Sequence, residues 1–537
     1  MKVGLAQINA AVGDFRGNTA KIQSYYQDAV RQDCGLVVFP ELALTGCHPR
    51  DLLLRRAFVS AANKALETLA RRIGRVPALV GTVTVNPDSP GRCLFNTVAL
   101  LRNGAVEALF HKRLLASHDA IDEDRYFEPG VEPATFEADG VRVGVAIGYD
   151  LWNDADFWED RRSSLDPVQD LLAQGCNVIV NPTACAWSLG KDKLRRAMMD
   201  TIAREDGVAV LMCNMVGSAD GLIFDGGNMA VSGEGLLAAG TPFQEQLVIV
   251  DLDAPPTTEE SQSSEEEQLL EGLILGARDF LSKSGQRKAV VPLAGLNGAV
   301  TAVIAARAME PKNVVGVVVT TDGAAADDAA DARKLAETLG IEFHSLDGTA
   351  PLGAVRALVA PPAEPGQEAA QTPDNVSERL SAFLLALASE RHLATLLTTP
   401  DKTDIALAKG VHADCAGSLA VLGDVPKTIV SRLAEFINRD QEIIPAAIMA
   451  RVKSNEGTEG MLNPHLVDAA VARYVDEDKS VEEIVADGFD RAVLKDLVHK
   501  IDQAESLRHK CPPCLNVTSR AFGPGRRMPL VQRFSEV

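Results

Sequence analysis

Three positions in the first third of the chain could take part in hydrolytic chemistry. Glu41 stands in FPELALTG directly after a short apolar run, and Lys112 stands in HKRLL. A carboxylate of this kind can act as a general base, and a lysine ammonium can stabilise an oxyanion. The stretch VGVAIGYDLW (143–152) reads as an apolar strand that ends in a tight turn, where many hydrolases place a nucleophile. Gly148 and Tyr149 occupy that turn, and neither can attack a carbonyl as a cysteine would.

The elements that must position these residues alternate between strands and helices. Apolar runs at 36–40, 78–85, 141–147 and 177–181 predict buried strands, and amphipathic stretches at 18–33, 58–73 and 191–206 predict helices. This alternation indicates a layered α/β domain over residues 1–252. The polar, acidic and proline-bearing segment 253–268 reads as a linker and the start of the next helix.

The alternation restarts after the linker and predicts a second domain over residues 269–537. Strands are expected at 289–293, 313–319 and 393–399, with helices up to residue 307 and over 327–339. This pattern is typical of a doubly wound parallel sheet. The segment 350–372 is rich in Ala, Pro and Gly, and we expect a loose surface excursion there.

Composition excludes several classes of function. The chain has 537 residues, 46% of them hydrophobic, and a formal net charge of −21, which argues against nucleic acid or an anionic membrane as the main partner. No apolar run reaches the roughly 18 residues of a membrane span, and the first residues lack the pattern of a signal peptide. Nine scattered cysteines do not make a disulfide framework, so a cytoplasmic location is expected.

The first domain resembles the nitrilase-like glutaminase half of bacterial glutamine-dependent NAD synthetases. The resemblance rests on GLAQINAAVGDFRGN, FPELALTG, RYFEPG, YDLW and FDGGN, in this order along about 250 residues. It implies that Glu41 matches the general base and Lys112 the oxyanion lysine, while Gly148 stands where the family has its nucleophilic cysteine. Cys47, Cys176 and Cys185 are not at that turn, so we expect no glutaminase activity.

Positions on the substrate side of this first site also differ from the family pattern. His118 stands where the family has a tyrosine, and Ala219, Asp220 and Gly221 replace its Q-D-E. The alternative for Glu41 and Lys112 is a buried ion pair without catalysis, because removing one partner of such a pair costs about 3–5 kcal/mol.

The second domain resembles the synthetase half of the same enzymes, of the adenine nucleotide alpha hydrolase-like type. TTPDKTDIALAKG, ADCAGSLAVLGDVPKTIVSRLAEFIN and RAFGPGRRMPL carry this resemblance over most of 265–530. It implies a loop that binds pyrophosphate at the start of a helix, with the family pattern S-G-G-x-D-S. The positions of the loop in this chain are Leu293, Ala294, Gly295, Leu296, Asn297 and Gly298. Leu293 would replace a hydroxyl donor at the phosphate wall, and we expect weakened pyrophosphate binding.

Some nucleotide-site positions remain family-like. The resemblance assigns Arg379, Lys402 and Lys427 to nucleotide binding. Asp404 and Asp414 have carboxylates that suit a magnesium ion. A surface or structural set of ion pairs is the alternative for Asp404, Asp414 and Lys427.

These observations together predict a nitrilase-like α/β/β/α sandwich followed by a doubly wound synthetase domain. The main functional hypothesis is a catalytically silent homologue with a structural, assembly-forming or regulatory role. It would be a homo-oligomer, or would assemble with an active paralogue, and would require no cofactor; residual binding of ATP, NAD or Mg²⁺ stays open. The alternative is an ammonia-dependent NAD synthetase that converts deamido-NAD to NAD with ATP and magnesium. A different amidase or ligase ranks last, and the Cys511/Cys514 pair gives only a weak metal or redox signal.

Overall fold

The chain divides into two compact units, Met1–Gln268 (unit 1) and Leu269–Val537 (unit 2). The structure is a computed structural model, and it describes residues 1–88, 90–117, 121–158, 163–257, 263–321, 325–359, 375–409, 417–455, 463–534 and 536. Two residues discussed above, His118 and Asp414, lie outside these ranges. No helix in the described ranges is long and apolar enough to cross a membrane.

The described strands of unit 1 form two six-stranded sheets and a hairpin. The first sheet has the order β14 (Gln246–Asp251), β1 (Lys2–Gln7), β2 (Leu36–Val38), β3 (Ala78–Val85), β4 (Leu94–Arg102), β5 (Ala105–His111). The second has the order β13 (Gly235–Ala239), β12 (Met229–Ser232), β9 (Ala209–Asn214), β8 (Val178–Thr183), β7 (Val141–Val145), β6 (Thr135–Ala138). The hairpin consists of β10 (Val216–Ala219) and β11 (Leu222–Asp225).

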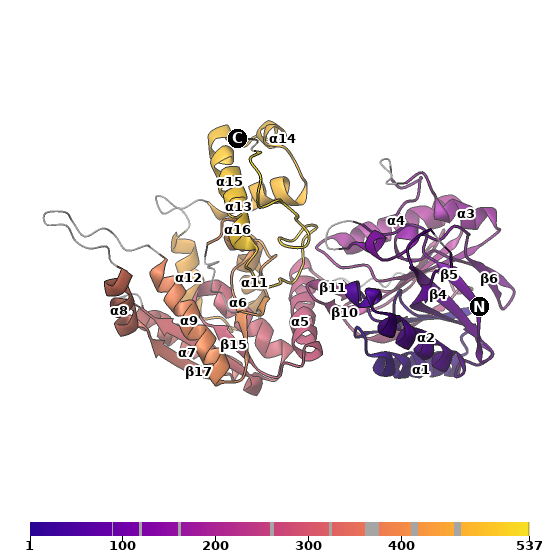
Figure 1. Cartoon of the computed structure of the whole chain (residues 1–537), viewed down its shortest axis with the longest axis horizontal. Coiled ribbons are helices and arrows are strands. Elements are labelled where there is room, and N and C mark those ends of the chain that lie inside the picture. The colour runs from indigo at the N-terminus through magenta and orange to yellow at the C-terminus, as the bar shows by residue number, and fades with distance from the viewer. Residues whose placement is uncertain are drawn as a thin grey trace. The chain divides into compact units, whose positions relative to one another are not determined.

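The two sheets pack face to face, and helices cover their outer faces. Leu5 and Val38 of the first sheet share one buried cluster with Val145 and Val180 of the second. A second cluster joins α1 (Phe15–Arg31) and α2 (Arg56–Ala70) to the first sheet, and a third joins α3 (Pro167–Ala173) and α4 (Lys191–Asp206) to the other. Figure 1 shows these two helix pairs on opposite sides of the sheets. Unit 1 is therefore the predicted α/β/β/α sandwich.

Local sequence explains where these elements begin and why the strands are apolar throughout. The Asp14 side chain accepts a hydrogen bond from the Gly17 N–H at the start of α1, and Asp166 caps α3 before Pro167. A strand that is covered on both faces buries both sets of its side chains, so β2, β7 and β8 have nearly continuous apolar runs. The apolar runs seen in the sequence therefore coincide with the sheet core.

Unit 2 is built on a five-stranded parallel sheet within the described residues. Its order is β17 (Glu342–Asp347), β16 (Val314–Thr320), β15 (Ala289–Pro292), β18 (Thr395–Thr398), β19 (Leu419–Ala420). The described helices are α5 (Glu265–Lys283), α6 (Gly295–Ala308), α7 (Ala325–Leu339), α8 (Thr349–Val359), α9 (Val376–Arg391), α10 (Lys402–Ala406), α11 (Lys427–Ile437), α12 (Ala446–Asn455), α13 (Pro464–Val471), α14 (Val481–Ala486), α15 (Arg491–Gln503) and α16 (Glu505–Arg508). The order confirms a doubly wound sheet. The chain moves from β15 to β16 on one side and returns to β18 on the other.

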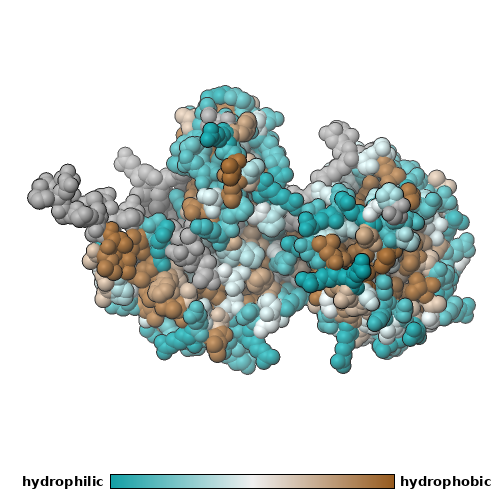
Figure 2. All heavy atoms as spheres, viewed as in Figure 1, coloured by the Kyte–Doolittle hydropathy of each residue, from teal (hydrophilic) through white to brown (hydrophobic). Residues whose placement is uncertain are grey.

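The prediction of a loose excursion at 350–372 is wrong for its first ten residues, which belong to α8. Alanine and leucine favour helix, and Leu352 is fully buried and anchors this one. Residues 360–372 lie outside the described ranges. Figure 2 shows hydrophobic residues gathered over α8 and α9, where Leu358, Val359, Phe383 and Leu387 are exposed.

Candidate functional site

Glu41 and Lys112 meet in unit 1, and a second glutamate joins them. Glu41 follows β2, Lys112 follows β5, and Glu123 opens the short 3₁₀ helix η2 (Glu123–Arg125). Lys112 Nζ lies 2.7 Å from Glu41 Oε1 and 2.8 Å from Glu123 Oε2, and all three side chains are almost completely buried. Asn96 Nδ2 donates to both glutamates, at 2.7 and 3.0 Å. Glu123 and Asn96 were not among the predicted site residues, although Glu123 lies just before the RYFEPG motif.

One ammonium between two buried carboxylates sets the charge of this cluster. Burial alone would raise the pKa of Glu41, but the charge and hydrogen bond of Lys112 outweigh it and lower that pKa. Burial raises the pKa of Glu123, which the negative charge of Glu41 raises further. Burial would lower the pKa of Lys112, but the two glutamates raise it. The cluster thus favours an ionised Glu41 beside a charged Lys112, which is the state a general base needs.

Gly148 lies directly against this pair. It opens the 3₁₀ turn η3 (Gly148–Leu151), where its φ is +51°, and a Cβ built on it would lie 2.4 Å from Glu41 Oε2 and 2.8 Å from Lys112 Nζ. Asn181 Nδ2 donates to the carbonyl of Gly148 and fixes the turn, and Ala184 N–H donates to Glu41 Oε2. A side chain at this position would therefore touch both the carboxylate and the ammonium, and glycine offers no nucleophilic atom there.

The other thiols near this cluster differ in their suitability as nucleophiles. Cys47 is buried, and its burial and the charges of Glu41 and Glu123 raise its thiol pKa well above the usual value. Burial also raises the pKa of the Cys176 thiol, which packs between α3 and the second sheet. Cys185 is half-buried, follows Ala184, and its backbone N–H donates to Asn214. None of the three occupies the turn at 148.

The hairpin positions that replace the family's Q-D-E lie where β10 turns into β11. Asp220 has a φ of +52°, and its carboxylate pairs with Arg50 Nε at 3.3 Å. Both side chains of this ion pair are exposed, so they form a charged surface at the hairpin and do not provide a buried group that could bind a substrate.

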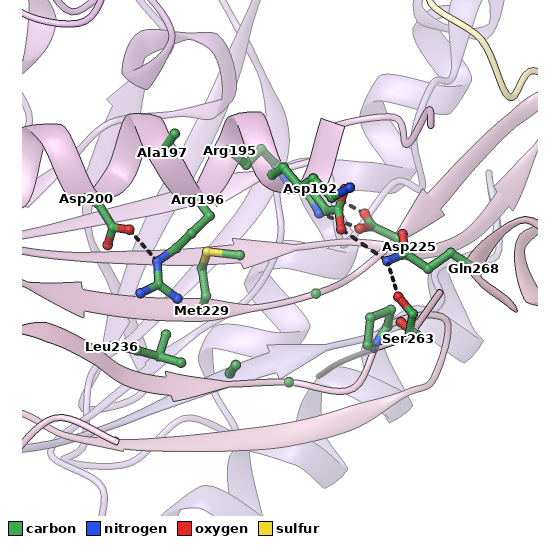
Figure 3. Close-up of a pocket in the computed structure, with 15 residues that line it drawn as sticks. Asp192, Arg195, Arg196, Ala197, Asp200, Asp225, Met229, Leu236, Ser263 and Gln268 are labelled. Atoms are coloured by element: carbon green, nitrogen blue, oxygen red, sulfur yellow. Dashed lines mark hydrogen bonds and ion pairs between the residues drawn. The ribbon is translucent and has the colours of Figure 1, made fainter. Parts of the chain in front are cut away.

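A separate pocket of about 520 Å³ lies between α4 and the strands β12 and β13. Its charged lining residues are engaged with one another. Figure 3 shows Arg195 with Asp225, Arg196 with Asp200, and Gln268 with Asp192 and Ser263. The pocket shares no lining residue with the cluster at Glu41, Lys112 and Gly148. Its contacts therefore tie α4 to the start of α5, and they add no group to that cluster.

The second candidate site lies at the carboxyl edge of the parallel sheet in unit 2. The loop after β15 leads into α6, whose N-cap residue Ala294 provides no side-chain hydrogen bond. Ala294 and Gly295 are exposed, and a Cβ built on Gly295 would meet no atom within 4 Å. A helix N-terminus of this kind attracts anions, and ligands of doubly wound sheets bind where the chain direction switches, here between β15 and β18.

Leu293 does not stand at a phosphate wall, so that expectation is wrong. Its side chain is only 4% exposed and packs on β16, because a Cβ on Gly316 would lie 2.5 Å from Leu293 Cδ1. Gly298 must remain small, since a Cβ there would lie 2.5 Å from the carbonyl oxygen of Pro292. The changed loop thus keeps its open helix start, and leucine has filled the core beneath it.

Four polar side chains cluster beside this helix start. Lys427 Nζ lies 2.5 Å from Asp401 Oδ2 and 3.1 Å from Asp404 Oδ1. Asn297 Nδ2 donates to the same two carboxylates at 2.9 and 3.2 Å. Burial and the charge of Asp401 raise the pKa of Asp404 to about 6. The sequence analysis paired Asp404 with Asp414 for magnesium, whereas the structure places Asp401 next to it.

Two other predicted nucleotide-binding residues lie elsewhere. Lys402 is almost fully buried, and its Nζ binds Asp476 at 2.6 Å and Asp424 at 3.0 Å, together with Thr518 and the Arg520 carbonyl. These contacts tie the Lys402 ammonium to the C-terminal segment, and its role in nucleotide binding stays a prediction. Arg379 is exposed on the first turns of α9.

The Cys511/Cys514 pair shows no sign of metal binding among the described residues. Cys514 is buried, and burial together with the charge of Asp424 raises its thiol pKa. The groups of described side chains that could hold a metal ion do not include either cysteine.

Comparisons with known proteins identify relatives of the whole chain. Residues 2–259 match the carbon-nitrogen hydrolase family, and residues 269–512 match the NAD synthase family. The glutamine-dependent NAD(+) synthetases of Synechocystis sp. and Thermotoga maritima are 34% and 31% identical, and in each case the match covers at least 99% of both chains. The structure of the glutamine-dependent NAD+ synthetase from Acinetobacter baumannii with ADP is similar at a TM-score of 0.76 and 27% identity, covering 99% of this chain and 98% of that one.

These findings correct the main functional hypothesis of the sequence analysis. The relatives that match this chain from end to end are named as enzymes, so a catalytically silent homologue is contradicted. The alternative, an ammonia-dependent synthetase, agrees better with them. Leu293, one of the changes from the family pattern on which the silent homologue depended, is a core residue.

Proposed function

Because this chain belongs to the glutamine-dependent NAD synthetase family, we propose that it is an ATP-dependent NAD synthetase that uses free ammonia. The observation that carries this proposal is the cluster of Asn297, Asp401, Asp404 and Lys427 beside the uncapped start of α6. It lies at the switch point of the sheet, where a nucleotide would place its phosphates.

The overall reaction joins ammonia to the carboxylate of deamido-NAD. A carboxylate oxygen attacks the α-phosphorus of ATP, and pyrophosphate leaves. The nitrogen of ammonia then attacks the acyl carbon of the adenylate, AMP leaves, and a proton is lost to give the amide. This chain's residues would bind and orient these groups: the N–H groups at the start of α6 would donate hydrogen bonds to phosphate oxygens, and the Lys427 ammonium would neutralise their charge.

Asp401 and Asp404 fit the implied magnesium ion, since both carboxylates are bound by Asn297 Nδ2 and lie next to each other, and carboxylate oxygens are the ligands that this hard cation prefers. Magnesium bound there would neutralise phosphate charge on ATP. The Lys427 ammonium and the Asn297 amide each bind both carboxylates, which holds the two carboxylates close together.

The use of free ammonia rests on the cluster in unit 1. Glu41 and Lys112 stand in contact with position 148, yet glycine there has no atom that could attack the amide of glutamine. The buried Cys47, whose raised pKa keeps it protonated, is no replacement. Without a thiol the amide nitrogen of glutamine is not released.

The test is NAD formation by the full chain with deamido-NAD, ATP and magnesium, with ammonium chloride as the nitrogen source. We expect AMP and NAD in equal amounts, with strong loss in the Lys427→Met variant. NAD formation that does not change in Lys427→Met would refute the assignment of the phosphate site. The predicted homo-oligomer stays a prediction, which light scattering on the same sample checks.

A further inference from the structure

Three aspartates that take no part in either site converge in unit 1. Asp154 and Asp156 lie in the loop after η3, and Asp206 is the last residue of α4. One carboxylate oxygen of each lies within 4.8 Å of the others. Asp166, the N-cap of α3, is a fourth carboxylate in the neighbourhood, and its oxygens accept from the backbone N–H groups of Ala155 and Gln169.

Two oxygens of this group are buried without a hydrogen-bond donor among the described residues. Asp154 is fully buried; its Oδ1 accepts from the N–H groups of Asp156 and Phe157, both at 3.1 Å, whereas its Oδ2 has no donor. Asp206 Oδ1 accepts from Gln169 Nε2 at 3.1 Å, and Asp206 Oδ2 is likewise buried without a donor. Buried oxygens of this kind are rare in proteins unless an ion or a water binds them.

The electrostatic environment of the three aspartates also favours a bound cation. Burial and the neighbouring Asp166, Asp206 and Asp156 raise the pKa of Asp154 to about 6, so this carboxyl is largely ionised at neutral pH. Burial raises the pKa of Asp206 as well. Asp206 stands at the C-terminal end of α4, where the helix dipole disfavours a negative charge. Among the described residues, none of the groups that act most strongly on either pKa is a lysine or an arginine.

We propose that Asp154, Asp156 and Asp206 bind a hard divalent cation, Ca²⁺ or Mg²⁺. Carboxylate oxygens are the ligands of such ions, and an ion bound at about 2.3–2.6 Å reaches oxygens that lie up to about 5 Å apart. The three oxygens meet this limit. The bound ion ties the loop that follows η3 to the end of α4, and so steadies the segment next to Gly148.

Terbium luminescence tests this site directly. All three tryptophans, Trp152, Trp158 and Trp187, lie in unit 1, and the backbone N–H of Trp158 donates to the backbone carbonyl of Asp154 at 3.2 Å. Tb³⁺ binds at oxygen sites that suit Ca²⁺, and a nearby tryptophan transfers its excitation to the ion. We expect saturable emission under excitation of tryptophan by the full chain. Tb³⁺ at Asp401 and Asp404 has no tryptophan of its own unit to excite it.

The variants separate this site from general binding to an acidic protein. Asp156→Asn changes an exposed side chain and leaves the core intact, and we expect it to weaken Tb³⁺ binding by about tenfold or more. Asp206→Asn should do the same. The matched control Glu205→Gln removes one charge from the adjacent exposed residue and should change the affinity less than about twofold. Equal affinity of all four proteins would overturn the proposal.

Competition identifies the ion. Millimolar Ca²⁺ should displace Tb³⁺ if a large, flexible oxygen site is present, and Mg²⁺ should displace it if the ion keeps part of its water shell. Failure of both ions to displace Tb³⁺ would also overturn the proposal. The ion that competes should raise the unfolding temperature seen by tryptophan fluorescence in the wild type and not in Asp156→Asn.

Discussion

The Lys112→Met variant tests the buried charge cluster of unit 1. In the wild type one ammonium lies 2.7 and 2.8 Å from two buried glutamates. Methionine keeps most of the volume but leaves two carboxylates without a cation, and breaking a buried pair in this way costs about 3–5 kcal/mol. A domain of this size loses about 2–4 °C in unfolding temperature per kcal/mol, so we expect a decrease of roughly 6–20 °C for unit 1.

Tryptophan fluorescence during thermal unfolding reports this loss selectively, because all three tryptophans belong to unit 1. Without the ammonium, burial raises the pKa of both Glu41 and Glu123 above the value of about 4.3 in the unfolded chain. The variant should therefore be closest to the wild type at low pH, and should lose stability as the pH rises through the raised pKa values.

The control is the triple variant Glu41→Gln, Lys112→Met, Glu123→Gln, which has no buried charge in this cluster. We expect it to recover most of the lost stability, because neutral groups of similar size need no counter-charge. A decrease of less than about 1 kcal/mol in Lys112→Met would refute the reasoning, since such a cluster would have to be hydrated.

Three further outcomes follow from unit 2. Leu293→Ala should lower the free energy of unfolding by about 2–5 kcal/mol, because this side chain fills the core under β16. Circular dichroism in urea measures this loss, and a change below about 0.5 kcal/mol would place the side chain outside the core. Lys427→Met should lower kcat/KM for ATP by about 10- to 150-fold, as expected for one lost charge-assisted hydrogen bond to a phosphate. The control Lys334→Met removes an exposed ion pair with Glu442 and should leave kcat/KM unchanged. Pyrophosphate exchange, which needs no ammonia, should rise as the pH passes through about 6 and Asp404 ionises, and should level off above pH 7; a rate that is flat from pH 5 to 7 would argue against a role for its carboxylate.

The sequence was sufficient to predict the layers of both units because their strands are covered on both faces. Apolar runs such as VRVGVAI (141–147) and LATLLTT (393–399) are typical of strands with both faces buried. The site residues Glu41 and Lys112 could also be predicted, because the motifs around them occur in the order that the family shows. Glu123 was missed because its contact with Lys112 depends on how the chain folds back after β5, which no local pattern encodes.

The errors in unit 2 concern the direction in which side chains point. The residue type alone does not show whether a loop residue faces a bound phosphate or the core. Leu293 was predicted to face the phosphate, whereas its side chain lies in the core. Lys402 and Lys427 both follow strand ends, yet only Lys427 stays near the start of α6, since Asp424 and Asp476 hold the other. Asp206 of the proposed cation site lies 50 residues or more after Asp154 and Asp156 in the sequence, so only the fold brings it to them.

The most direct measurement compares two nitrogen donors in the same assay of NAD formation from deamido-NAD, ATP and magnesium. The absence of a nucleophilic atom at Gly148 predicts turnover with ammonium chloride and at least about a hundredfold less with saturating glutamine. Equal rates with both donors would show that another group releases ammonia from glutamine and would contradict the account of unit 1. No turnover with either donor would contradict the proposed synthetase.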